Sequence, residues 1–242
     1  MPPILAFEKI SKRFGAVVVA DGLDLLLAEG EALGIIGPNG AGKTTLFGIA
    51  SGTVAPDAGR VIFAGLDITS LPPQRRCRMG IGRSFQIPQP FNGMTVFENL
   101  VVAAAFGRDR GEREVYPRCV ELLDQCGLAA KANRLAGSLT LLDRKRLELA
   151  RALATQPRVL LLDEVAGGMT EHECTVLVDL IRRIRQGGIS IIWIEHVVHA
   201  LMALVDRLLV LHGGSFIGEG APQNVIVSPA VREIYMGIPA DA

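Results

Sequence analysis

A run of eight residues has the composition and spacing of a phosphate-binding loop. It matches the pattern GxxxxGK[ST] and reads Gly37, Pro38, Asn39, Gly40, Ala41, Gly42, Lys43 and Thr44, with Thr45 next in the chain. Glycines let backbone N–H groups curl around phosphate oxygens, the lysine can meet the outer phosphates, and the threonine hydroxyl can ligate Mg²⁺. The alternative is a purely structural glycine-rich turn. The strand-like residues 32–36 before the run and the helix-like residues 45–50 after it favour the phosphate site.

Two carboxylates follow an apolar run later in the chain. Residues 159–162 read Val-Leu-Leu-Leu and lead into Asp163 and Glu164. An open parallel sheet binds its ligand at the carboxyl ends of its strands. There, Asp163 can hold Mg²⁺ through water, and Glu164 can align or deprotonate the water that attacks a γ-phosphate. The alternative is an acidic strand end that caps the next helix, but beside a phosphate loop the pair predicts nucleotide hydrolysis.

One of the four histidines has a position that suits catalysis. His196 follows the apolar run 189–194, so its imidazole is expected at the same edge of the sheet, within reach of a γ-phosphate oxygen. The other three, His172, His199 and His212, have no such position and are expected on the surface. The sequence therefore predicts Glu164 and His196 as the catalytic residues.

These residues need a parallel sheet to position them, and the chain supplies candidate strands. Short runs that are apolar on both faces, as buried parallel strands are, occur at residues 32–36, 159–162, 189–194 and 208–211. Shorter alternating segments, expected to form a small antiparallel sheet, occur at residues 5–10, 23–27 and 59–63. An α/β fold is therefore predicted.

The middle of the chain is helical in character, from about residue 94 to residue 154. Helices are expected at 101–106, at 115–126 before Gly127, and at 144–154 before Pro157. A further amphipathic helix is expected over 170–185, where it would cover the sheet. A helical insertion into the sheet domain is the interpretation that fits this order.

The composition of the chain argues against several classes of protein. Of 242 residues, 49% are hydrophobic, which excludes disorder as the main state. The 25 basic residues balance the 25 acidic ones, so no overall field attracts the chain to nucleic acid or to an anionic membrane. The apolar runs are far shorter than a membrane span, and the N-terminus lacks the layout of an export signal. The four cysteines form no CxxC pair, so we expect reduced thiols and no structural metal.

Taken together, the motifs resemble the ATP-binding subunit of ABC transporters over nearly the whole chain. The resemblance also rests on Gln86 in the run Arg-Ser-Phe-Gln, on residues 139–150 in the signature position, and on Ile-Glu-His ending at His196. It implies an α/β, P-loop NTPase (RecA-like) core with an N-terminal antiparallel β subdomain and an inserted helical subdomain. A single domain would span 1–242, with its core at 1–93 and 155–242 and the helical subdomain at about 94–154.

The resemblance implies ATP and Mg²⁺ as cofactors and adds two residues to the site. Phe14, in the run Lys-Arg-Phe-Gly, would stack on adenine; a core aromatic is the alternative reading of this residue. Gln86 would join Thr44 and Asp163 as a metal ligand and would connect Mg²⁺ to a transporter-facing loop.

Within the family, the chain is most similar to importers of branched-chain amino acids, amides and urea. The segments that carry this similarity are residues 69–73, 85–91, 94–100, 218–222 and 234–237. The implied partners are membrane permease subunits, a second ATP-binding subunit that is either identical or different, and, indirectly, an external solute-binding protein. The chain would then lie peripherally on the cytoplasmic face of the inner membrane, with each ATP between the phosphate loop of one copy and the signature of the other.

The signature segment departs from the family pattern. Where the family has Ser-x-Gly-Gln, this chain has Thr140, Leu141, Leu142 and Asp143. Leu142 puts a branched side chain where glycine lets the backbone approach the opposite γ-phosphate, and Asp143 would add a negative charge there. Alternatively, Asp143 only caps a helix that begins near Arg144. The departure predicts a weakened ATP site on the partner and favours a pair of two different ATP subunits. Val165 in place of the usual Pro is a minor change.

Two other function classes share the phosphate loop. A non-transport ABC ATPase that acts on nucleic acid or ribosomes usually carries a coiled coil, zinc modules or tandem ATP domains, and this chain has no heptads, no CxxC and no basic stripe. A P-loop GTPase would need an NKxD-like loop, and a small-molecule kinase a substrate lid; no NKxD occurs. We therefore expect no nucleic-acid partner.

Overall fold

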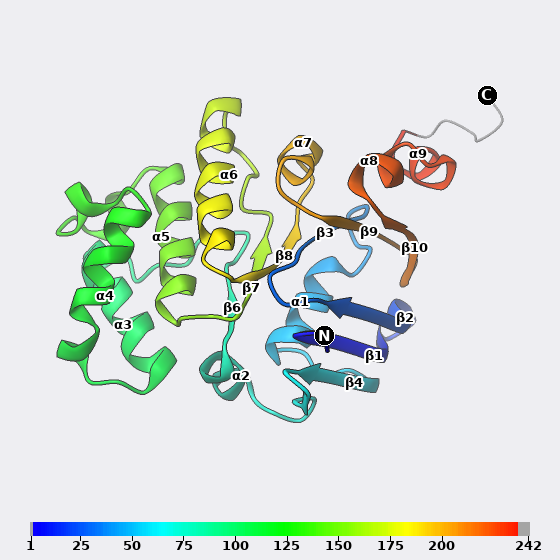
Figure 1. Cartoon of the computed structure of the whole chain (residues 1–242), viewed down its shortest axis with the longest axis horizontal. Helices are drawn as coiled ribbons and strands as arrows, with labels where there is room; N and C mark the ends of the chain where they lie inside the picture. The colour runs from blue at the N-terminus through cyan, green and yellow to red at the C-terminus, as the bar shows by residue number, and fades with distance from the viewer. Residues whose placement is uncertain (1, 237–242) are drawn as a thin grey trace.

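A sheet of six strands in the order β10-β9-β3-β8-β7-β6 forms the centre of the molecule (Figure 1). In that order the strands are Ser215–Gly220, Arg207–His212, Ala32–Ile36, Ser190–Ile194, Val159–Asp163 and Ile81–Arg83. Strands β9 to β6 are parallel, and only β10 runs antiparallel, against β9. The carboxyl ends of β3, β8, β7 and β6 therefore lie at one edge of the sheet. This computed structural model describes residues 2–236; Met1 and residues 237–242 of the predicted domain lie outside the described residues.

The four predicted parallel strands are confirmed as β3, β7, β8 and β9, and both edge strands were missed. Edge strand β6 has three residues, one of them glycine, which is too short to show a pattern. Edge strand β10 holds two glycines and a glutamate and is never fully buried. Edge strands lack the apolar residues on both faces by which the central strands were recognised.

A second sheet, with the order β2-β1-β4-β5, contains the predicted antiparallel strands. Its members are Val17–Leu27, Leu5–Phe14, Ala58–Phe63 and Leu66–Asp67. Strands β1 and β2 form a long hairpin that extends well beyond the predicted segments, through several register shifts. The alternating pattern is lost where these shifts occur, which explains why the sequence predicted shorter strands.

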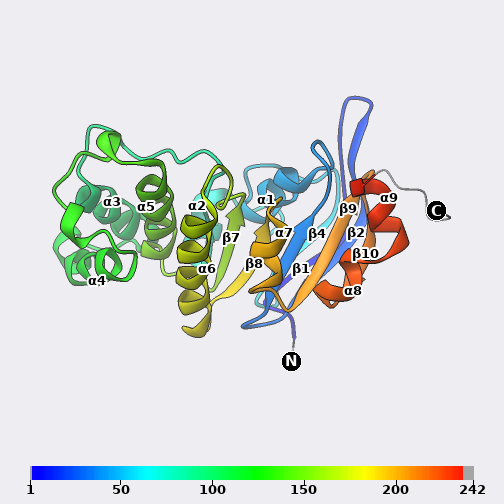
Figure 2. The same cartoon turned by 90° about the horizontal axis from the view of Figure 1, so that it is seen from above.

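Three helices gather at one end of the molecule, drawn in green in Figures 1 and 2. They are α3 (Val96–Arg108), α4 (Glu112–Gln125) and α5 (Leu141–Ala154), with short 3₁₀ turns at Ala129–Lys131 and Ala136–Ser138. Helix α3 begins at Val96 rather than at residue 101, because Thr95 and Glu98 form a capping box at its start. The inserted helical subdomain of the predicted fold is therefore present.

The remaining helices cover the sheets. They are α1 (Lys43–Ser51), α2 (Pro73–Met79), α6 (Glu171–Gln186), α7 (Val198–Met202), α8 (Pro222–Ile226) and α9 (Pro229–Met236). Helix α6 matches the amphipathic segment predicted over 170–185, and Thr170 caps it. Between residues 2 and 236 no helix has the length and apolar character that a membrane crossing requires.

The apolar core lies in two layers, one on each face of the central sheet. Leu160 and Leu162 face a layer made with the helices, and Val159 and Leu161 face a layer made with α1 and the antiparallel sheet. Successive side chains of a strand point to opposite faces, so a strand buried on both faces has to be apolar throughout. This packing fixes the strand ends that hold the polar residues described next.

Candidate active site

Four neighbouring strands deliver the predicted residues to one edge of the sheet. The phosphate loop follows β3, His196 follows β8, Glu164 follows β7 and Gln86 follows β6. They surround a cavity of about 460 Å³, within the size range of small-molecule sites. The lining residues are Val19, Asn39, Gly40, Ala41, Gly42, Lys43, Thr44, Thr45, Gln86, Glu164 and His196. The three histidines that were expected on the surface, His172, His199 and His212, are exposed.

At two positions of the phosphate loop, Gly37 and Gly42, the structure leaves room only for glycine. A Cβ on Gly37 would lie 2.3 Å from the carbonyl oxygen of Leu211, and one on Gly42 would lie 2.5 Å from that of Val19. Gly42 also has a φ of 101° and is the N-cap of α1, with no side chain capping the helix. The first N–H groups of α1 therefore remain available to an anion in the cavity.

Lys43 lies buried at the start of α1. Its Nζ donates to the carbonyl oxygens of Gly37, at 2.7 Å, and of Pro38, at 3.0 Å. Burial lowers the pKa of Lys43, and the nearby negative charges of Glu164 and Asp163 oppose this shift. The lysine is thus a positive charge held within the loop, where bound phosphates can replace its carbonyl partners.

Glu164 is held from two sides. One carboxylate oxygen, Oε1, lies 2.8 Å from Nε2 of His196, and the other, Oε2, accepts a hydrogen bond from the Gln86 side chain. Its backbone has a φ of 47°, in the left-handed region, which costs a non-glycine residue about 1 kcal/mol. Such strain is most often retained at functional sites, where the surrounding contacts impose it.

Asp163 carries the carboxylate suited to a metal ion. Its Oδ2 accepts a hydrogen bond from Arg83 at 3.0 Å, while its Oδ1 is buried and has no hydrogen-bond partner within residues 2–236. Burial raises the pKa of Asp163, and Arg83 opposes this. Mg²⁺ prefers oxygen ligands and retains several waters. Asp163 is not among the residues that line the cavity, but its Oδ1, unpartnered within the described part of the chain, fits with Thr44 and Gln86 on the cavity wall an ion held through water.

Sequence reasoning missed two buried charges that hold the segment after β7. Lys145 of α5 donates to the carbonyl oxygens of Val165, at 2.9 Å, and Gly167, at 2.7 Å. Glu195 accepts from the backbone N–H of Ala166 at 2.6 Å. Burial lowers the pKa of Lys145 and raises that of Glu195. The two charges fix the backbone next to Glu164, and the sequence gives little sign of their burial, since Lys145 stands between Arg144 and Arg146 and Glu195 follows the end of an apolar run.

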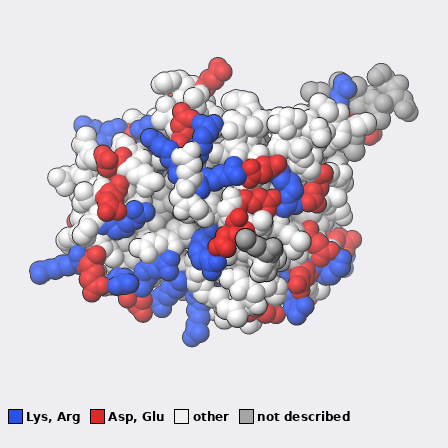
Figure 3. Space-filling view, viewed as in Figure 1, with Lys and Arg blue, Asp and Glu red and all other residues white. Residues whose placement is uncertain are grey.

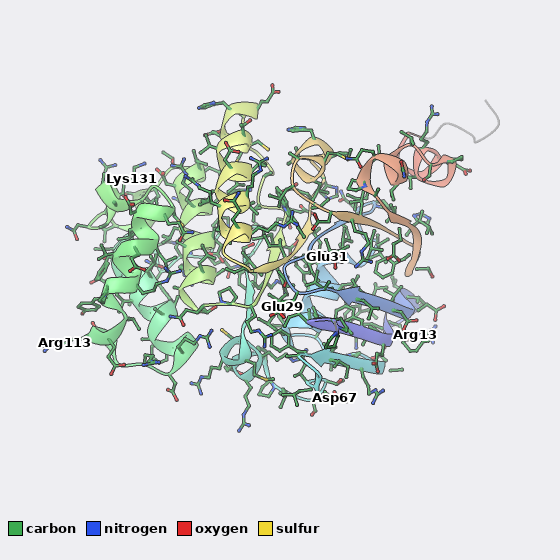
Figure 4. The ribbon with its side chains drawn as sticks, viewed as in Figure 1. Arg13, Glu29, Glu31, Asp67, Arg113 and Lys131 are labelled. Atoms are coloured by element: carbon green, nitrogen blue, oxygen red, sulfur yellow. The ribbon has the colours of Figure 1, made fainter. Side chains whose placement is uncertain are left out.

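Phe14 lies outside the cavity lining. It ends β1 and is 51% exposed, with Nζ of Lys12 5.3 Å from its ring centroid. The core-aromatic reading is therefore wrong. Figure 4 labels the adjacent Arg13 at the end of this hairpin, away from the helical subdomain. Stacking on adenine stays a prediction for Phe14, and Val19 of the same hairpin is the residue that reaches the cavity.

The signature segment differs from both expectations for Asp143. Helix α5 begins at Leu141 with Thr140 as its N-cap, so Asp143 lies in the first turn and does not cap the helix. Asp143 is buried, accepts hydrogen bonds from Lys131 and from the Thr140 hydroxyl, and lies 3.7 Å from Arg146. Figure 4 places Lys131 at the helical end of the molecule. The negative charge is therefore buried and paired within the chain.

Similarity to known proteins agrees with this arrangement. The sequence profile of the ABC transporter family matches residues 20–167. LivG of Salmonella typhimurium, a high-affinity branched-chain amino acid transport ATP-binding protein, is 36% identical, covering 97% of this chain and 98% of LivG. LptB of Acidithiobacillus ferridurans, a lipopolysaccharide export system ATP-binding protein, is also 36% identical, covering 98% of both chains.

A solved structure provides the corresponding comparison of folds. The ADP conformation of an ATP-binding cassette from an ABC transporter has a TM-score of 0.90 to this chain at 32% identity, covering 98% of this chain and 100% of that one. The P-loop NTPase core predicted from the sequence is thereby confirmed. The chain belongs to the ABC transporter family, as an ATP-binding subunit that hydrolyses ATP.

Proposed function

We propose that this chain powers an importer of branched-chain or other amino acids, or of amides such as urea. The similarity to LivG, whose name states such a substrate, supports this class. LptB is equally similar and serves an exporter, so overall identity alone does not select the solute. The importer-type segments at residues 69–73, 85–91 and 94–100 favour import. An external solute-binding protein would then deliver the solute to the permease.

Within this function, we propose Glu164 as the general base, with His196 beside it on the γ-phosphate. Lys43 and the N-terminus of α1 would bind the phosphates. Thr44, Gln86 and Asp163 would hold Mg²⁺, which when bound neutralises charge on the β- and γ-phosphates. The side-chain hydrogen bond from Gln86 to Glu164 supports a direct link between the base and the segment that begins at Gln86.

The observation that carries the transporter role is an exposed apolar strip beside the site. Four large side chains with exposed surface form it, namely Phe85, Ile87, Phe91 and Met94. Its backbone is fixed from the helical subdomain, since Arg151 donates to the Gln89 carbonyl at 2.8 Å and the buried Asn99 bonds the backbone of Phe91. An apolar strip on a rigid backbone is typical of a protein interface. We propose that the permease docks here, at the cytoplasmic face of the membrane.

Changing Phe91 to Asp tests this docking. Its ring packs under Arg151, 5.2 Å from the guanidinium carbon, and is 46% exposed. A buried aromatic at an interface typically contributes about 2 kcal/mol or more. We expect permease-stimulated ATP hydrolysis and solute uptake in vesicles to fall together by about tenfold or more, with ATP affinity of the isolated chain unchanged.

Leu66→Asp is the matched control, because Leu66 is equally apolar and exposed but lies on β5, in the other sheet. It should leave uptake unchanged. Full uptake with Phe91→Asp would refute the docking strip. Failure of the chain to co-purify with any permease in detergent would refute the transport role itself.

We propose that the second ATP-binding subunit of the transporter is a protein with a different sequence from this chain. At the start of α5, the backbone N–H groups of Leu141 and Leu142 have no partner within the helix, because the first intrahelical hydrogen bond is made by Arg144. The side chains at these two positions are leucines, and that of Leu141 is 48% exposed. The Thr140 hydroxyl is also engaged, since it donates to Asp143 at 2.9 Å. A facing triphosphate would meet apolar surface where donors are needed.

Changing Leu142 to Gly should therefore raise the ATP hydrolysis of the isolated chain at saturating ATP by about tenfold, because one preorganised donor to a transferring group is worth about 10²-fold. Asp143 is left in place because its buried ion pairs hold α5. Val120→Gly, at an exposed position of α4, has a comparable helix-propensity cost away from this segment and should leave the rate unchanged. Equal rates for Leu142→Gly and the unmodified chain would show that the leucine is harmless.

The charge distribution gives no support to a nucleic-acid function. On the face shown in Figure 3, Lys and Arg groups lie among Asp and Glu groups over the core. A backbone-binding surface for nucleic acid would need a continuous basic stripe. We therefore retain transport as the proposed function.

A further inference from the structure

Arg83 lies between the predicted metal carboxylate and the apolar strip. It ends β6, and its Nη2 donates to Oδ2 of Asp163 at 3.0 Å. The two side chains are 11% and 2% exposed, so water cannot replace either partner easily. Neither the phosphate loop nor the general base uses Arg83, which leaves this buried cation without a role in the proposed function.

The contact has a definite geometric consequence for Asp163. A carboxylate can rotate to exchange its two oxygens, but here Oδ2 is bonded to Arg83 and Oδ1 is left without a partner among the described residues. The Ser84 hydroxyl, 3.3 Å from the Asp163 backbone N–H, ties the same strand end to β6. The orientation that leaves Oδ1 free is thus set by Arg83.

The guanidinium is itself held by aromatic rings. Its central carbon lies 5.8 Å from the ring centroid of Phe47, which is buried, and 5.1 Å from that of Phe85, which is partly exposed. Phe85 and Arg83 also line a groove of about 250 Å³ between α2 and α5. Stacking of this kind fixes the plane of an arginine side chain. A partner that moves Phe85 would therefore move the group that orients Asp163.

We propose that Arg83 is a positioning residue that aims Asp163 at Mg²⁺ and connects that carboxylate to Phe85 in the docking strip. The orientation of Asp163 by Arg83 concerns this chain alone, whereas the connection to Phe85 rests on the proposed permease docking. Arg83 touches neither nucleotide nor metal in this proposal. It acts by holding one carboxylate oxygen so that the other stays available.

The test is the Mg²⁺ dependence of ADP binding, measured by titration calorimetry on the isolated chain. Arg83→Met keeps the length of the side chain and removes its charge. In this variant we expect the ADP affinity measured in EDTA to stay within about twofold of that of the unmodified chain. The Mg²⁺ concentration that gives half of the maximal gain in ADP affinity should rise about tenfold, which is the scale of one charge-assisted hydrogen bond. Arg83→Lys should restore part of this loss. Phe85→Ala should raise the Mg²⁺ requirement by about threefold.

Arg158→Met is the matched control, since Arg158 also lies near a phenylalanine, Phe63, and pairs with a carboxylate, Glu29, but away from the cavity. It should leave the Mg²⁺ requirement unchanged. An Mg²⁺ requirement that is unchanged or lower in Arg83→Met would overturn the positioning role. A lower Mg²⁺ requirement would mean that Arg83 competes with the ion for Asp163. A raised requirement with Arg83→Met but none with Phe85→Ala would overturn the connection to the strip.

Two further outcomes are decisive. If Arg83→Met fails to fold by circular dichroism, Arg83→Gln decides, because it also removes the charge, and an Mg²⁺ requirement equal to that of the unmodified chain would then overturn the proposal. If the chain binds no permease yet shows the expected Mg²⁺ shifts, the proposed transport function is wrong and the positioning role stands.

Discussion

Changing Glu164 to Gln should lower the rate of ATP hydrolysis by at least 10²-fold while ATP binding is retained. The substitution keeps the size of the side chain and its position between His196 and Gln86, but an amide cannot accept the proton of an attacking water. Loss of a general base costs about 10²- to 10⁴-fold in rate. Steady-state phosphate release, with and without permease, gives the rate, and a titration with ATP gives the affinity.

Glu173→Gln is the control for this experiment. Glu173 is partly exposed and closes the capping box of α6, so the same chemical change is made outside the lining of the cavity. It should affect stability slightly and leave turnover unchanged. Hydrolysis by Glu164→Gln within about threefold of the unmodified rate would remove Glu164 from the role of base.

Changing Lys43 to Ala should weaken ATP binding by about 10- to 100-fold. Lys43 provides a buried positive charge among groups that otherwise offer only partial charges. A charge-assisted hydrogen bond contributes about 1.5–3 kcal/mol, and each 1.4 kcal/mol is tenfold in affinity. The loss should be seen in the dissociation constant measured by titration, in contrast to Glu164→Gln, which acts on the rate.

Lys9→Ala provides the comparison, since the Lys9 side chain is largely exposed and pairs with Asp24 in the antiparallel sheet. ATP affinity should be unchanged in that variant. An unchanged affinity in Lys43→Ala, with a normal thermal melt, would contradict the assignment of residues 37–44 to the phosphates.

Much of the site could be predicted because its chemistry lies in contiguous motifs. The phosphate loop, Asp163 with Glu164, and His196 each follow an apolar strand directly, so finding the strand also locates the side chain. Parallel pairing then brings the strand ends together without any knowledge of side-chain packing. The lining of the cavity follows from these two facts.

The contacts that could not be predicted join residues far apart in the chain. Arg83 on β6 meets Asp163 on the neighbouring strand β7, Lys145 reaches the backbone of Val165 and Gly167, and Lys131 pairs with Asp143. A charged residue on a helix or strand end reads as solvent-exposed unless its burial is known. Asp143 is an example, because Lys131, which pairs with its charge, belongs to a separate 3₁₀ turn that the sequence does not indicate.

The hydrogen bonds around Glu164 bear on how much ATP an unpartnered subunit consumes. Both of its carboxylate oxygens accept a contact, from His196 and from Gln86, and donors to a carboxylate make it a weaker proton acceptor, so opening one of these bonds would make Glu164 a stronger base. Gln86 begins the segment that a permease would cover, and docking is the event that can open its bond. A chain without a permease should therefore idle as a slow ATPase, and the cell can hold surplus copies without draining its nucleotide pool.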